Sequence, residues 1–99
     1  MAKKAVNGQK SESEDIVFFY GAECTWCHKM VPNLAKAQEQ TGVRVVKREV
    51  WHDAGNAKML LAAGGARCGG VPFMINNRTG KWLCGFSEVD DIVRLMRGG

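Results

Sequence analysis

The chain has 99 residues, of which 45% are hydrophobic, and its formal net charge is +4 at pH 7. This length and composition predict one globular domain with a modest core. The basic residues form no stripe interleaved with aromatic residues, and no apolar run approaches the ~20 residues that cross a bilayer. We therefore expect neither nucleic-acid binding nor membrane insertion, and we expect a monomer.

Residues 1–14 are polar and charged and lack a hydrophobic face, which predicts a disordered tail before a domain at 15–99. This tail lacks the apolar centre of a secretory signal, so we expect a cytoplasmic protein. Structural disulfides are rare in that reducing compartment, and the four cysteines therefore indicate catalysis, metal binding or packing.

An unbroken apolar run at 16–20 predicts a strand that is buried on both faces. Apolar residues at helical spacing then predict a helix that begins at or just after Cys24 and ends before Gly42. Its expected apolar face consists of Met30, Leu34 and Ala37. Alternation of apolar and polar residues at 43–50 predicts the second strand.

The second half of the chain predicts a helix at 54–63 and two strands, at 71–75 and 81–86, joined by a turn into an antiparallel hairpin. A final helix is expected after Ser87, which is a natural N-cap, with Asp90 completing a capping box. The order β-α-β-α-β-β-α predicts an α/β fold, because the first βαβ unit must be right-handed and parallel. We expect a four-stranded mixed sheet with helices on both faces.

Cys24 and Cys27 form a Cys-x-x-Cys pair at the expected start of the first helix. Unpaired backbone N–H groups and the helix dipole at that end stabilise negative charge, which favours the thiolate of Cys24. Cys27 follows one helical turn later on the same face, where its thiol can attack a mixed disulfide formed on Cys24. The pattern predicts Cys24 and Cys27 as the catalytic pair of a thiol–disulfide oxidoreductase.

Two longer segments carry a resemblance to known proteins. The stretch from Phe18 to Pro32, with Pro32 five residues after Cys27, resembles the active-site segment of thioredoxins. The stretch 70–77 resembles the cis-proline strand shared by thioredoxins and glutaredoxins. Together with the order of elements, the resemblance to this thioredoxin-like superfamily covers about residues 16–97.

The resemblance implies a cis Val71–Pro72 bond beside the cysteine pair, with a substrate chain paired to Val71 in a strand-like manner. It also implies that Pro72 keeps metal away from the dithiol and that Trp26 contacts partners. With Thr25, which helps to set the polarity of the site, the expected substrate contacts are Thr25, Trp26, Val71 and Pro72. The expected partners are disulfide-bonded proteins and a thiol reductant or reductase, with no cofactor besides the redox-active disulfide.

Two positions depart from thioredoxins. Phe18 occupies the place of a buried Asp that assists proton transfer, and Glu23 occupies the place of a Trp. The size of the chain and its ending look more like glutaredoxin, in which a Gly-containing turn and the start of the last helix hold glutathione. Gly85 and Ser87 are therefore the candidate contacts for glutathione as a co-substrate.

Three other interpretations stay open. Cys24, Cys27 and His28 also match Cys-x-x-Cys-His, the attachment sequence of c-type haem. Four cysteines could form a structural zinc site, although Cys68 and Cys84 are 16 residues apart and lack a second Cys-x-x-Cys. The fold could also serve as a binding module without catalysis, because a fold alone does not determine function.

Cys68 and Cys84 also need an interpretation of their own. Cys84 falls within an expected strand and is expected to be a buried packing residue, because a free cysteine behaves as a small hydrophobic side chain. Cys68 lies in a Gly-rich loop four residues before Pro72, so it is either a packing or loop thiol or a third redox thiol that relays or regulates.

Overall fold

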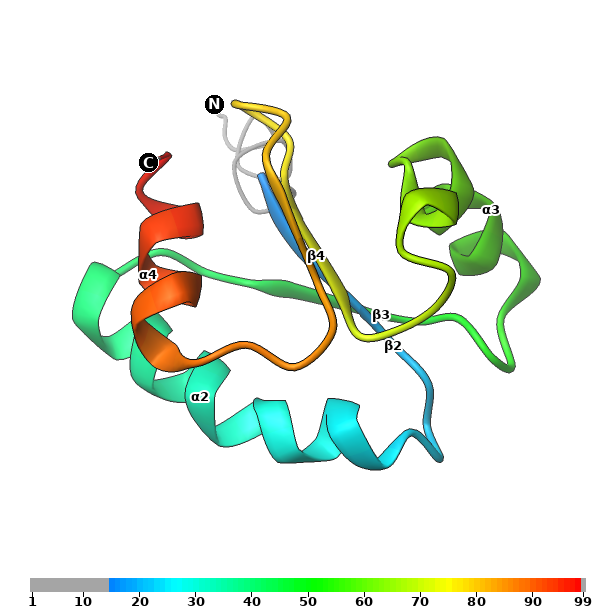
Figure 1. Ribbon diagram of the computed structural model, residues 1–99, viewed down its shortest axis with the longest axis horizontal. Coiled ribbons are helices and arrows are strands. Elements are labelled where there is room, and N and C mark those ends of the chain that lie inside the picture. Colours follow the sequence, from blue (N-terminus) through cyan, green and yellow to red (C-terminus); the bar gives the residue numbers. More distant parts are fainter. Residues whose placement is uncertain (1–14, 99) are drawn as a thin grey trace, which may run out of the picture.

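The computed structural model describes residues 15–98, so the tail expected at 1–14 lies outside the described residues. Four strands form one sheet in the order β3-β2-β4-β5 (Figure 1). They are β2 (Ile16–Tyr20), β3 (Val46–Glu49), β4 (Phe73–Asn76) and β5 (Trp82–Cys84). β3 runs parallel to β2, whereas β4 is antiparallel to β2 and to β5. The sheet is therefore mixed, as the sequence predicts.

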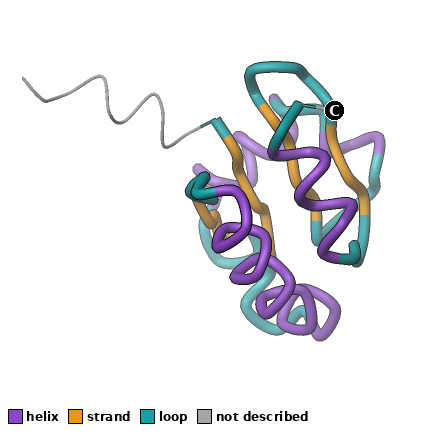
Figure 2. Tube along the Cα trace, turned by 90° about the vertical axis from the view of Figure 1, so that its left-hand side faces the viewer, coloured by secondary structure: helices purple, strands orange, loops and turns teal. Residues whose placement is uncertain are grey.

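Within residues 15–98 the helices are α2 (Thr25–Thr41), α3 (Ala54–Ala62) and α4 (Val89–Met96). A 3₁₀ turn, η1 (Gly65–Arg67), follows α3. α2 and α4 cover one face of the sheet and α3 lies on the other (Figure 1). Figure 2 shows α2 and α4 in front of the strands from that side. The observed order of elements confirms the predicted β-α-β-α-β-β-α arrangement.

The apolar run in β2 supplies both halves of the core. Ile16 and Phe18 point to the face covered by α2 and α4, where they join the buried side chains of both helices. Val17 and Phe19 point to the opposite face and pack with Leu60 of α3. Because successive side chains of a strand alternate between faces, this unbroken run is what a central strand with two covered faces requires.

Three strands are shorter than the sequence predicts. β4 begins at Phe73 instead of Val71, because Pro72 has no N–H to donate to a neighbouring strand. Val45, expected within the second strand, donates its N–H to the side chain of Gln38 at 2.8 Å and lies outside β3. Gly85, expected within the fourth strand, has a positive φ of 85°. A positive φ is incompatible with extended backbone, so β5 ends at Cys84.

The predicted cap of the last helix is wrong. Glu88, rather than Ser87, is the N-cap of α4, and its side chain makes no capping hydrogen bond. The hydroxyl of Ser87 instead donates to Gly85 O at 3.3 Å in the preceding turn. Asp90 and Asp91 place negative charge in the first turn, where it is favourable with respect to the helix dipole.

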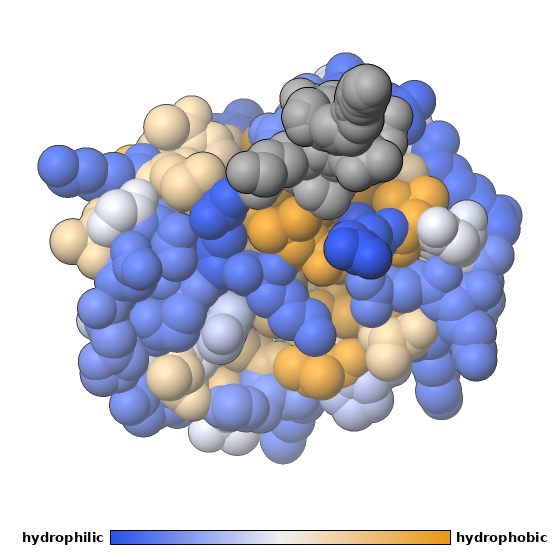
Figure 3. Space-filling model, turned by 180° about the vertical axis from the view of Figure 1, so that it is seen from behind, coloured by the Kyte–Doolittle hydropathy of each residue, from blue (hydrophilic) through white to orange (hydrophobic). Residues whose placement is uncertain are grey.

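Hydrophobic side chains also reach the surface. The large exposed ones are Trp26, Val31, Trp51, Met59, Leu61 and Phe86. On the face seen in Figure 3, hydrophobic residues gather in the middle and hydrophilic residues surround them. Within residues 15–98, no helix combines the length and the apolar character needed to span a membrane.

Candidate active site

Cys24 and Cys27 lie at the N-terminal end of α2 and are joined by a disulfide, with Cα atoms 5.2 Å apart. Cys24 is the N-cap, and its Sγ accepts the backbone N–H of Cys27 at 3.1 Å. The two residues differ in access, because Cys24 is 7% exposed and Cys27 is 1% exposed. A substrate can therefore reach Cys24 more easily, and the donor already aimed at its sulfur favours a thiolate there.

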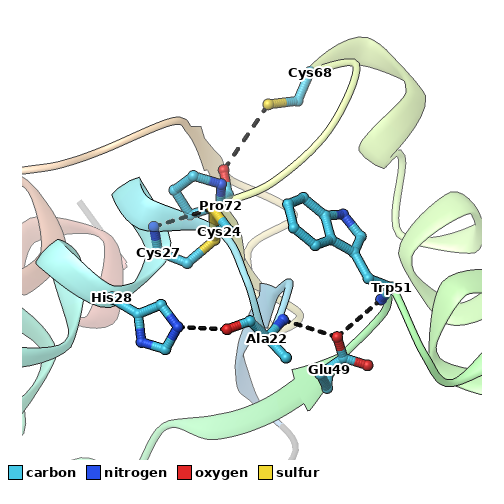
Figure 4. Close-up of a disulfide and its surroundings, with 8 residues drawn as sticks. All are labelled: Ala22, Cys24, Cys27, His28, Glu49, Trp51, Cys68 and Pro72. Carbon is cyan, nitrogen blue, oxygen red and sulfur yellow. Dashed lines mark hydrogen bonds between the residues drawn. A yellow bond between two sulfur atoms is a disulfide. The ribbon is translucent and has the colours of Figure 1, made fainter.

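An open, mainly apolar cavity of about 430 Å³ lies at this end of the fold. We call it the groove, and its lining residues are Trp26, Val71, Pro72, Gly85 and Phe86. Pro72 lies directly beside the Cys24–Cys27 disulfide (Figure 4). The Val71–Pro72 peptide bond is cis, and Pro72 O accepts the N–H of Gly85 at 2.8 Å. The groove is therefore lined by three segments of the chain: Trp26 of α2, two residues from Cys24, then Val71 and Pro72, and then Gly85 and Phe86.

An aromatic pair forms one wall of the groove. The rings of Trp26 and Phe86 meet edge to face, with centroids 5.7 Å apart. Lys29 Nζ lies 4.6 Å from the centroid of the Trp26 ring, within the range of a cation–π interaction. The wall therefore presents apolar surface with a positive charge beside it.

A second, smaller cavity of about 140 Å³ lies behind Cys27. Phe18 lines it, is 1% exposed and stacks on Tyr20 with ring centroids 5.8 Å apart. The groups along this cavity that carry exchangeable protons are Tyr20, His28 and Lys47. The Nε2 atom of His28 donates to Ala22 O, because a carbonyl oxygen can only accept (Figure 4).

The loop that leads to Cys24 is fastened by one carboxylate. Glu49, at the end of β3, accepts backbone N–H groups from Ala22 at 2.9 Å and Trp51 at 3.1 Å (Figure 4). It also accepts the backbone N–H of His52 at 2.8 Å. Burial alone would raise the pKa of Glu49, but these three N–H donors and the nearby His52 bring it below its ordinary value. The ionised carboxylate thus ties the loop before Cys24 to the loop after β3.

Two further contacts join these loops. Glu23 and His52 form an exposed ion pair with a shortest distance of 2.8 Å. The hydrogen bond to Glu23 raises the pKa of His52, and the charges of Glu23 and Glu49 raise it further. The indole of Trp51 lies so close over Gly21 that a Cβ atom there would overlap the ring. An aromatic ring therefore covers this loop, although Glu23 stands where thioredoxins have their Trp.

The other two cysteines form a second disulfide, with Cα atoms 5.4 Å apart. Cys84 is exposed and Cys68 is half-buried, so the expectation of a buried packing thiol at Cys84 is wrong. The four sulfur atoms form two separate disulfides, which also contradicts a four-cysteine zinc site. In the described part of the chain, the one group of three or more metal-ligating side chains within 4.8 Å contains no cysteine. That group is Glu23, Glu49 and His52.

The structure brings most of the predicted contact residues together. Trp26, Val71, Pro72 and Gly85 line the groove, whereas Thr25 is exposed at the start of α2 and is not among its lining residues. Ser87 is buried and also does not line the groove. Sequence reasoning missed Phe86, which completes the aromatic wall. Its one sequence signal is an aromatic residue directly after a glycine at the end of an expected strand.

No protein-family model matches the chain, and no curated protein sequence is significantly similar to it. Solved structures are similar in fold. A thioredoxin from Aeropyrum pernix superposes with a TM-score of 0.66 at 19% identity, covering 93% of this chain and 82% of that one. Chloroplastic thioredoxin z superposes with a TM-score of 0.62 at 26% identity, covering 95% of this chain and 92% of that one.

A third similar structure is thioredoxin-2, a component of the malaria parasite protein secretion machinery. It has a TM-score of 0.59 at 18% identity and covers 85% of this chain and 81% of that one. These likenesses confirm a thioredoxin-like fold, as the sequence motifs predict. The fold, with the Cys24–Cys27 pair at the start of α2, supports a thiol–disulfide oxidoreductase in general terms.

Proposed function

We propose that this protein exchanges disulfides with polypeptide substrates, with Cys24 as the nucleophile and Cys27 as the resolving thiol. One observation carries the proposal: the more accessible sulfur, that of Cys24, accepts a backbone N–H at a helix N-terminus beside an open apolar groove. Thiolate stabilisation, access and a neighbouring second thiol are the three requirements of rapid exchange.

The first step joins the substrate to Cys24. In the reduced protein, the Cys24 thiolate attacks one sulfur of a substrate disulfide, so that one S–S bond forms and one breaks. The departing substrate sulfur leaves as a thiolate and takes a proton from solvent. The N–H of Cys27 and the N-terminal end of α2 stabilise the negative charge on Cys24 before this attack.

The second step releases the substrate. Cys27 loses its proton and attacks the Cys24 sulfur, which restores the Cys24–Cys27 disulfide and frees the second substrate thiol. Phe18 cannot accept that proton, so the proposed route runs through the small cavity behind Cys27, where His28 and Lys47 lie. The substrate gains two electrons, and an external thiol reductant later returns them to the protein.

The groove favours a polypeptide as the substrate. Its lining is mainly apolar, and the Trp26–Phe86 wall suits an apolar side chain next to the substrate cysteine. Lys29 favours an acidic group nearby. For glutathione, the candidate contact Ser87 is buried, and its hydroxyl already donates to Gly85 O. These contacts favour a polypeptide over glutathione as the substrate.

Trapping experiments test the assignment of roles. With a disulfide-bonded peptide as substrate, Cys27→Ser should accumulate a covalent mixed disulfide on Cys24 that is detectable by intact mass. Cys24→Ser should form no adduct and should lose turnover, because Cys27 is almost completely buried. Turnover that survives in Cys24→Ser would overturn the proposal. An adduct on Cys27 instead of Cys24 would reverse the two roles.

A further inference from the structure

The second disulfide joins two of the three segments that form the groove. Cys68 ends the 3₁₀ turn η1 and precedes Pro72 by four residues, and Cys84 directly precedes Gly85 and Phe86. Pro72, Gly85 and Phe86 all line the groove. The Cys68–Cys84 bond therefore fixes the proline side of the groove to the Phe86 side.

Each sulfur of this disulfide lies near a backbone carbonyl group. Pro72 O accepts the N–H of Gly85 at 2.8 Å, and Cys68 Sγ lies 4.0 Å from the same oxygen (Figure 4). Cys84 Sγ lies 3.7 Å from Cys68 O. In the disulfide neither sulfur carries a hydrogen, whereas each thiol of the reduced pair would have a carbonyl acceptor nearby. The fold therefore accommodates the disulfide and also provides a hydrogen-bond acceptor for each thiol of the reduced pair.

The second disulfide is also open to attack. Cys84 is exposed and ends β5, an edge strand of the sheet, whereas Cys24 is only 7% exposed. Exposed disulfides are in general the labile ones, because an attacking thiolate can reach them.

We propose that Cys68–Cys84 is a second redox site, which dithiol reductants reduce at Cys84 and whose state controls substrate binding in the groove. A reductant thiolate attacks Cys84 Sγ and forms a mixed disulfide, and Cys68 leaves as a thiolate that takes up a proton. The second thiol of the reductant loses its proton and attacks the mixed disulfide, which releases Cys84 as a thiol. Two electrons pass to the protein, and the reductant becomes a disulfide.

Reduction changes the groove through the Pro72 carbonyl. The Cys68 thiol becomes a second donor near Pro72 O and competes with the N–H of Gly85. The covalent link that holds Gly85 and Phe86 beside Pro72 is lost at the same time. Substrate binding therefore weakens, while the Cys24–Cys27 pair stays chemically intact. This consequence rests on the proposed function, whereas the reducibility of the second pair does not.

The redox behaviour can be measured without any substrate. In Cys24→Ala/Cys27→Ala, the only cysteines of the chain are Cys68 and Cys84. We expect millimolar dithiothreitol, without denaturant, to make both thiols available to an alkylating reagent, with two added groups in the intact mass. The control is the same treatment in denaturant, which reports complete reduction. A pair that is alkylated only in denaturant would overturn the proposal, because it would be an inert structural bond.

The effect on the groove is a separate measurement. With a disulfide-bonded peptide, turnover is measured at a reductant concentration that leaves Cys68–Cys84 oxidised in the wild type, as checked by alkylation. We expect KM of Cys68→Ala/Cys84→Ala, which lacks the covalent link between the two segments, to rise roughly fivefold over wild type, as for the loss of one hydrogen bond in the bound complex. The turnover number should stay within about twofold, because Cys24 and Cys27 keep their positions at the start of α2. An unchanged KM would contradict control of the groove. Absence of exchange in the wild type would instead refute the proposed function and leave the alkylation result valid.

Discussion

The two disulfides of this protein hold different kinds of structure together. Cys24 and Cys27 are three residues apart at a helix start, and both are buried. Cys68 and Cys84 are 16 residues apart and connect a loop to an edge strand, with Cys84 exposed. The first bond closes a short loop that the helix would form in any case. The second closes a long loop and joins both sides of the groove.

The difference in loop length predicts which of the two disulfides contributes more to the stability of the fold. A crosslink stabilises a fold mainly by restricting the unfolded chain, and the restriction grows with the length of the closed loop. Folding and disulfide formation are linked in a thermodynamic cycle. A disulfide that stabilises the folded state is therefore harder to reduce in the folded protein than in the unfolded chain, by the same free energy. The pair that stabilises the protein more should therefore be the harder one to reduce at equilibrium, so Cys24–Cys27 should be reduced at a lower reductant concentration than Cys68–Cys84. The exposure of Cys84 bears instead on how fast a reductant thiolate can attack the second pair.

The largest expected effect is on the free energy of unfolding. In Cys24→Ala/Cys27→Ala, reduction of Cys68–Cys84 should lower the free energy of unfolding by about 3 kcal/mol. In Cys68→Ala/Cys84→Ala, reduction of Cys24–Cys27 should lower it by roughly 2 kcal/mol. Each value is the difference between urea unfolding of one variant with and without reductant. The effect of the alanine substitutions on stability is present in both measurements and cancels in the difference. Equal or reversed losses would show that the loop lengths do not determine the contributions of the two bonds.

Sequence reasoning identified the first pair because its signal is local. Cys24 and Cys27 lie between a buried strand and an amphipathic helix, and both elements can be predicted from short windows. The pairing of Cys68 with Cys84 depends on the hairpin register, in which Cys84 lies opposite Phe73, and on the path of the loop before Pro72. Neither can be deduced from the spacing of the cysteines, so the expected packing thiol at Cys84 was wrong.

Of the other two errors, the first is local and the second has the same origin as the error at Cys84. The N-cap expected at Ser87 depends on a local motif, but Ser87 is buried in the turn after β5 and bonds to Gly85 instead. The groove wall at Phe86 could not be predicted, because the ring faces Trp26 from an element 60 residues further along the chain. Contacts between distant segments require the tertiary structure, whereas strand and helix patterns do not.

The aromatic wall should affect substrate binding more than stability. Trp26→Ala or Phe86→Ala removes one ring of an edge-to-face pair, which is worth about 0.5–1.5 kcal/mol beyond its buried area. We expect kcat/KM for a peptide disulfide to fall roughly two- to tenfold, mainly through KM. Leu61→Ala is the control, because Leu61 is also exposed but lies on α3, on the opposite face of the sheet. A similar loss in Leu61→Ala would show that the effect is not specific to the groove.

Loss of the Glu49 carboxylate should affect the first pair but not the second. Glu49→Gln keeps the shape of the side chain but removes the charge that accepts three backbone N–H groups around the loop before Cys24. We expect a reduced rate of exchange at Cys24 and an unchanged rate of alkylation of Cys68 and Cys84 in reductant. A change in the alkylation of the second pair would show that this loop influences both disulfides.

The same carboxylate predicts a dependence of stability on pH. The folded pKa of Glu49 lies below the ordinary value of 4.5, so its contribution is present above pH 4.5 and is lost as the pH falls through the folded pKa. Urea unfolding between pH 3 and pH 6 should therefore show a smaller acid-induced loss in Glu49→Gln than in the wild type. An identical loss in both proteins would show that Glu49 does not contribute in this range.

The smallest expected effect concerns His52, which pairs with Glu23 directly before Cys24. Its pKa is raised above 6.5, chiefly by the hydrogen bond to Glu23, so its contribution to stability is complete below pH 6.5 and is lost as the pH rises through the folded pKa. Titration by NMR should show that Glu23→Gln lowers the pKa of His52. Glu39→Gln, which removes the same charge from an exposed position on α2, should leave it unchanged. Equal shifts in both variants would mean that His52 responds to overall charge, and the loop before Cys24 would then be held by Glu49 and Trp51 without help from this ion pair.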